Sequence, residues 1–186
     1  HGFIFGGASN VAIQSAIDLS KRFNVIFVYC IGPLSNELIS NNIKSFKIKS
    51  PNNFILNSLV CSELDKLTNN ISKKNTIIHI HNFTKAFTIS LLYWISKRKF
   101  KTYITVHDFF LFCPNGAYFN FKNNKICKLI PGSKKCFVSN CDKYNFFLKL
   151  LKYFRFIFIK CIVFKSKNFI SELNEVSNFE FLAVTL

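Results

Sequence analysis

The pair His107-Asp108 is the first feature of this sequence whose residue types could do chemistry. It follows a β-rich run from Thr102 to Val106. An imidazole at a strand end can hydrogen-bond a substrate hydroxyl or phosphate, and it changes protonation near neutral pH. Such pairs also occur by chance, and a histidine that simply caps the strand end is the alternative. The pair is a candidate catalytic site whose meaning depends on its surroundings.

Four of the seven cysteines follow this pair: Cys113, Cys127, Cys136 and Cys141, with 13, 8 and 4 residues between them. Four thiolates can hold a structural zinc ion or an iron–sulfur cluster. The spacing contains no C-x-x-C pair, so two disulfides or ordinary buried thiols are alternatives. The odd total of cysteines favours a reducing compartment over a disulfide scaffold.

A third group is Gly6-Gly7, directly before Ala8-Ser9. Backbone N–H groups and the helix dipole at a helix start can bind a phosphate or another anion. The stretch is neither a dinucleotide fingerprint nor a P-loop, because the later glycines and the lysine are missing. A tight turn that needs small residues is the alternative.

His79 and His81 alternate along one predicted strand and therefore share a face, which is the arrangement of a metal-binding pair. Neither has a carboxylate neighbour in the sequence. We therefore favour packing over metal binding for these two histidines.

The elements that position these residues alternate between strand and helix. The sequence predicts strands at 25–30, 46–48, 76–81 and 102–106, and helices from Ser9 or Asn10 to 22, at 53–69 and at 84–97. This alternation indicates right-handed βαβ units and a parallel sheet flanked by helices, an α/β fold. Ligands bind such sheets at the carboxyl ends of the strands, where Gly6-Gly7, residues 79–82 and His107-Asp108 would lie.

The carboxyl-terminal third of the chain combines a long loop with a basic helix. Residues 109–141 read as a long irregular loop, and residues 144–164 as a helix with Lys149, Lys152, Arg155 and Lys160 on an arc of roughly 140°. This helix could lie on an anionic membrane surface or pack on the sheet with one wet face. A strand at 162–164 and a helix at 168–174 are predicted next. The tail from 179 to 186 is either a further strand or a non-native end.

The composition is that of one folded domain, and its positive charge either favours anionic partners or reflects a lysine-rich chain with solvated faces. The 186 residues are 49% hydrophobic and 18% charged, which excludes a disordered chain, and the formal net charge is +16. A nucleic-acid-binding domain would rest on this charge alone, because no RNP, zinc-finger or helix-turn-helix signature accompanies it. We therefore expect no nucleic-acid partner. No apolar run has the length of a membrane span.

Four segments occur in the order typical of one family: FGGASNVAIQSAIDLSKRF, IIHIHNFTKAF, TVHDFFLFCPNGAYFNFKNNKIC and CFVSNCD. Together they resemble the amino-terminal domain of family 4 glycosyltransferases of the GT-B fold. The stretch HDFFLFCPNG with its spaced cysteines is similar to a subgroup that builds surface polysaccharides. The resemblance covers about three quarters of the chain, and residues 32–74 contribute little to it.

The resemblance implies a Rossmann-like domain spanning residues 1–186, with its first strand truncated and with no counterpart of the family's carboxyl-terminal, donor-binding domain. It implies retaining transfer of a sugar from a nucleotide-sugar to a glycan or lipid-linked acceptor. Gly6 and Gly7 would approach the donor, Asn82 and Asp108 would bind substrate, and His107 would line the site beside the transferred sugar. Catalysis would need no cofactor, and the cysteine loop would shape the acceptor side.

The expected location is the cytoplasm, free or at the inner face of a membrane. The alternative to an enzyme is a basic α/β module that docks on membranes or anionic polymers. By itself, without a donor-binding half, the chain is expected to be inactive.

Overall fold

The structure is a computed structural model that describes residues 6–49, 58–81, 88–165 and 180–184. The chain divides into two compact units. Residues 1–105 and 166–186 form the first, which we call the sheet unit. Residues 106–165 form the second, which we call the cysteine unit. The expectation of one domain over residues 1–186 stays a prediction.

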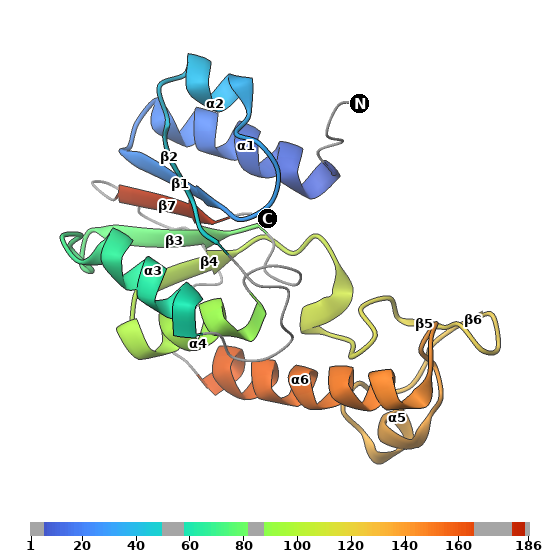
Figure 1. Ribbon diagram of the computed structural model, residues 1–186. Helices are drawn as coiled ribbons and strands as arrows, with labels where there is room; N and C mark the ends of the chain where they lie inside the picture. The colour runs from blue at the N-terminus through green and yellow to red at the C-terminus, as the bar shows by residue number, and fades with distance from the viewer. Residues whose placement is uncertain (1–5, 50–57, 82–87, 166–179, 185–186) are drawn as a thin grey trace. The chain divides into compact units, whose positions relative to one another are not determined.

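A five-stranded parallel sheet forms the sheet unit, in the order β2-β1-β7-β3-β4 (Figure 1). The strands are β1 (Val25–Tyr29), β2 (Lys44–Lys47), β3 (Thr76–Ile80), β4 (Lys101–Ile104) and β7 (Glu180–Val184). The first four lie within two residues of their predicted bounds. The predicted α/β class, with a parallel sheet, is thereby confirmed.

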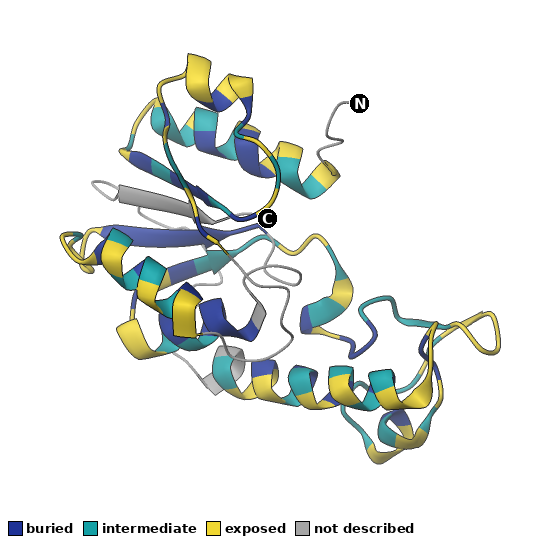
Figure 2. Cartoon of the chain, in the orientation of Figure 1, coloured by how far each residue is buried: buried dark blue, intermediate teal, exposed yellow. Residues whose placement is uncertain are grey.

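The strand β7 comes last in the chain and yet lies in the middle of the sheet. Ala183 is the register partner of Phe27 in β1 and of His79 in β3. The carboxyl-terminal tail therefore forms a strand, which was one of the two predicted alternatives. All five residues of β3 are buried (Figure 2). Because successive side chains of a strand point to opposite faces, both faces of the sheet are covered at β3.

Four helices accompany the sheet: α1 (Gly7–Ser20), α2 (Asn36–Ser40), α3 (Ser58–Thr68) and α4 (Thr88–Arg98). Helix α1 buries Ala12, Ile13 and Ala16 in a core cluster with residues of β1. The predicted cap at Ser9 or Asn10 is wrong. The N-cap is Gly6, whose carbonyl accepts the N–H groups of both residues, so they lie inside the first turn.

The cysteine unit holds more structure than the sequence predicts. The expected irregular loop contains a 3₁₀ turn, η1 (Phe109–Leu111), a short hairpin of β5 (Phe119–Asn120) and β6 (Lys125–Ile126), and a helix, α5 (Lys134–Val138). Helix α6 (Phe146–Lys165) follows.

The strand predicted at 162–164 is wrong. Helix α6 continues through Lys165, and no glycine or proline interrupts it. The helix predicted at 168–174 lies outside the described residues. None of the helices in the described part of the chain is both long enough and apolar enough to cross a membrane.

Replacing Ala183 with proline tests the central place of β7. We expect Ala183→Pro to lower the free energy of unfolding by more than about 3 kcal/mol, because proline removes a ladder hydrogen bond from a strand paired on both sides. Lys47→Pro in the edge strand β2 is the control. The N–H of Ile48 donates to Tyr29, so by alternation that of Lys47 points away from β1. Equal losses in denaturant unfolding of the two variants would contradict a central β7.

Candidate functional site

The glycines Gly6 and Gly7 lie at the amino end of α1. Figure 1 shows α1 running antiparallel to the strands, so its first residue lies at the edge where the strands end. Gly6 has an ordinary extended backbone, with φ −65° and ψ 161°. A Cβ atom built on either glycine would meet nothing within 4 Å. The fold itself therefore requires glycine at neither position, and both leave open space beside a helix start.

His79 in β3 and His81, which follows the end of that strand, pack against each other. The ring centroids of His79 and His81 are 4.1 Å apart, and the His79 Nε2 atom lies 2.8 Å from the Thr105 hydroxyl. Both rings are buried. These contacts favour the packing role over the metal pair. Asn82, the predicted substrate-binding residue that follows, lies outside the described residues.

The candidate catalytic residue His107 is exposed and immediately precedes a capped turn. The Asp108 carboxylate accepts the N–H of Phe110 at 3.0 Å and so caps η1. A short polar side chain at this position satisfies a backbone donor that the turn leaves open. Asp108 thus has a structural role, and its predicted role in substrate binding stays a prediction.

The Phe110 ring, in the turn after His107, lies close to both Arg155 and Gly116. The Arg155 guanidinium lies 5.1 Å from the centre of this ring, and a Cβ on Gly116 would approach it to 2.6 Å. Burial lowers the pKa of Arg155, while the Asp108 carboxylate acts in the opposite direction. Gly116 also has φ +74°, so glycine is required there both by backbone and by space.

The predicted site residues fall in both units. Gly6 and Gly7 belong to the sheet unit, whereas His107 and Asp108 begin the cysteine unit. His107 lies three residues after the last residue of β4. A common site formed by the glycines and the histidine stays a prediction.

The side chain of Asn115 contacts two of the predicted cysteine ligands, Cys113 and Cys141. Its carbonyl oxygen accepts from the Cys113 thiol at 3.0 Å. Its amide donates to the Phe119 carbonyl at 2.7 Å and lies 3.5 Å from the Cys141 sulfur. The Cys127 N–H donates to Tyr118 at 2.7 Å, which ties the hairpin to the same region. The sequence alone does not single out Asn115.

The four cysteines of the cysteine unit carry free thiols, and Cys113, Cys136 and Cys141 are buried. Within the described residues, no three His, Cys, Asp or Glu side chains are grouped as metal ligands. The zinc or iron–sulfur site stays a prediction.

The sequence also gives no sign of the buried cation Lys149. Its side chain is fully buried, and its ammonium donates to the carbonyls of Cys136 and Phe137 at the end of α5. The rings of Phe137, Phe146 and Tyr153 lie 5.3–5.7 Å from this ammonium. Burial lowers the pKa of Lys149, while the thiols of Cys136 and Cys141 oppose that shift.

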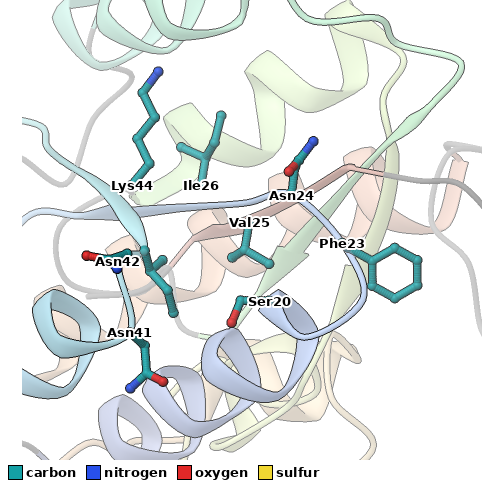
Figure 3. Close-up of a pocket in the computed structure, with 9 residues that line it drawn as sticks. Ser20, Phe23, Asn24, Val25, Ile26, Asn41, Asn42 and Lys44 are labelled. Carbon is teal, nitrogen blue, oxygen red and sulfur yellow. The ribbon is translucent and has the colours of Figure 1, made fainter.

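A pocket of about 390 Å³ lies at the opposite edge of the sheet (Figure 3). Residues of the α1–β1 and α2–β2 connections line it, among them Phe23, Asn42 and Lys44. These connections lie where the strands begin. The pocket therefore contains none of the predicted site residues, and its few polar groups do not form a set of acid, base and nucleophile.

The chain was compared with family models, with curated proteins and with solved structures, and nothing matched in any of the three.

We expect Lys149→Met to lower the free energy of unfolding by about 1–3 kcal/mol, because the carbonyls of Cys136 and Phe137 lose their donor inside the protein. Lys160→Met, on the exposed side of the same helix, is the matched control and should change stability by less than about 0.5 kcal/mol. Denaturant unfolding measures both. A Lys149→Met protein as stable as the control would show that the buried contacts contribute nothing.

Thiol reactivity tests the state of the cysteines. At about pH 8 we expect exposed Cys161 to react first with an aromatic disulfide reagent, and Cys161→Ser to remove this fast phase. Cys30 should react slowly, because burial raises its pKa to about 12. Unfolding without reductant should expose all seven thiols. A lower total would reveal disulfides, and zinc or iron released in step with the buried thiols would establish the predicted metal site.

Proposed function

We propose that this chain is the amino-terminal, acceptor-side half of a family 4 glycosyltransferase that takes part in surface polysaccharide synthesis. The observation that carries the proposal is the pair Gly6-Gly7, which stands in open space at the start of α1, at the edge where parallel strands end. A helix start of this kind suits the phosphates of a nucleotide-sugar. The four sequence segments that resemble the family support the same assignment.

In this reaction the bond between the anomeric carbon of the sugar and the diphosphate oxygen breaks, and its electron pair leaves with the diphosphate. The acceptor hydroxyl oxygen bonds to the same carbon, and its proton passes to the departing diphosphate oxygen. The backbone N–H groups at the start of α1 would stabilise the developing negative charge. His107 would position and polarise the sugar from the turn that Asp108 caps. In the family that it resembles, this chemistry requires no metal.

The proposed partners are a nucleotide-sugar donor and a glycan or lipid-linked acceptor at the cytoplasmic side of a membrane. The family holds the nucleotide with a carboxyl-terminal domain, for which these 186 residues contain no counterpart. The chain by itself should therefore bind the donor poorly and should not turn over. Measurable sugar transfer by the isolated chain would overturn this division of labour.

A second candidate is a non-enzymatic module that docks on an anionic surface, and the exposed apolar and basic residues of the cysteine unit favour it. The two candidates differ at His107. In a protein that carries both halves, His107→Ala should lower sugar transfer by about 10²-fold or more for a transferase. The same substitution should leave surface binding unchanged for a docking module.

The glycines provide the sharpest test of the transferase. Gly6→Ala and Gly7→Ala should each leave the free energy of unfolding within about 1 kcal/mol, since the added methyl meets open space. Each should lower transfer by about tenfold or more, because the methyl would hold the donor phosphate away from the N–H groups. Gly116→Ala is the contrast, with an expected loss of about 1–3 kcal/mol of stability against Phe110. Full transfer by both alanine variants would contradict a donor site at α1.

A further inference from the structure

Helix α6 carries an exposed apolar stripe along one side. Phe147, Leu151, Phe154 and Phe158 are 67%, 49%, 60% and 39% exposed. They follow one another at intervals of four, three and four residues, so they lie within an arc of about 60° on the helix. Exposed aromatic and aliphatic side chains in such a continuous line are unusual, because this surface gains free energy when it leaves water.

The cations on α6 lie on the other side of the helix. Lys149 is buried against α5, Lys152 pairs with the Asp142 carboxylate at 2.6 Å, and Arg155 lies over the Phe110 ring. Tyr153, Phe156 and Ile159, which share this side, are buried as well. Of the four cations on the predicted basic arc, Lys160 alone is exposed. The loop segments supply carbonyls, a carboxylate and an aromatic ring that hold three of the four cations.

Helix α5 lies beside the stripe and carries two exposed lysines. The rings of Phe137 and Phe154 are 6.2 Å apart, which places α5 beside the stripe. On α5, Lys134 and Lys135 are exposed, and Val138 is 67% exposed. Figure 2 shows the exposed positions that recur along α6 and on α5.

The charge of the cysteine unit is one-sided. Residues 106–165 contain eleven Lys and Arg against two Asp. Of these carboxylates, Asp142 is buried and paired with Lys152, and Asp108 caps η1. The surface around the stripe is thus apolar and positive. It complements an anionic lipid bilayer, whose headgroups are negative and whose interior is apolar.

We propose that the stripe Phe147, Leu151, Phe154 and Phe158, together with Lys134 and Lys135, docks the cysteine unit on an anionic lipid surface. Helix α6 lies in the plane of the membrane interface, with its apolar side chains among the acyl chains. The lysines of α5 contact the headgroups. This docking does not require the transferase activity. It specifies the surface with which the second candidate, the docking module, would bind.

Vesicle co-sedimentation of the full chain tests the apolar part. The chain should bind vesicles of phosphatidylcholine and phosphatidylglycerol, and only weakly vesicles of phosphatidylcholine alone. Phe147→Ser with Phe154→Ser should weaken binding by about tenfold or more. Phe147→Ser with Leu151→Ser gives the same test without touching the Phe137 contact. The control is Val11→Ser with Ile39→Ser, which removes two exposed apolar side chains of the sheet unit.

The charge is tested by Lys134→Gln with Lys135→Gln, which should weaken binding to the anionic vesicles by about tenfold. Lys73→Gln with Lys74→Gln, an exposed pair in the sheet unit, is the matched control and should bind as the unmodified chain does. Circular dichroism verifies that each variant is folded.

Unchanged vesicle binding by both stripe variants would overturn the proposal. Light scattering provides the other decisive result. If the unmodified chain is a dimer and the stripe variants are monomers that still bind vesicles, then the stripe is an interface between two copies of the chain and the lipid proposal fails.

Discussion

The sheet is continuous only because β7 lies between β1 and β3. Each residue of β7 from Phe181 to Val184 has a register partner on both sides. Without this strand, β1-β2 and β3-β4 would be two separate pairs with exposed inner edges. Isolated strand pairs are marginally stable in water, and unpaired edges invite association with other chains. The edge that carries Gly6-Gly7 therefore depends on a segment far away in the sequence.

In the cysteine unit, the hydrogen bonds of buried polar side chains connect the parts of the chain. This unit contains only short elements apart from α6, and its loops contribute many backbone carbonyls. Lys149, Asn115 and Asp142 are all buried, and each contacts at least two groups from other parts of the unit or from the following turn. Such networks are costly unless every member is satisfied. Contacts of this kind hold Lys149 and Lys152 of α6 inside the unit, while Phe147, Leu151, Phe154 and Phe158 are exposed.

The sequence predicted those parts of the fold that are encoded locally. The strands β1 and β3 are uninterrupted runs of β-branched and aromatic residues, and both were located correctly. The position of β7 was not predictable, because local pattern says nothing about which distant strands will be its neighbours. The periodicity of α6 revealed two arcs, one basic and one apolar. It could not show which of them faces inward, because that choice depends on carbonyls such as those of Cys136 and Phe137.

The candidate site was predictable to a similar extent. The sequence placed His107 directly after a strand, whereas β4 ends at Ile104, three residues before it, and the catalytic role of His107 stays a prediction. It also placed Gly6 at a helix start, although it assigned the cap to the wrong residues. The cap that Asp108 provides is a local contact to Phe110, two residues later in the chain. The need for glycine at position 116 depends on how the folded loop places the Phe110 ring, which a single sequence does not display.

The central position of β7 also determines the order in which the strands of the sheet can pair. Its partners in β1 are more than 150 residues earlier in the chain, as the pairing of Val25 with Phe181 shows. Closing so long a loop costs conformational entropy before any contact compensates it, and pairings of this range slow folding. During synthesis, β1 to β4 emerge from the ribosome well before the strand that joins them. Until β7 is synthesised, the edges of β1 and β3 that pair with it are open, and they are exposed to association with other proteins.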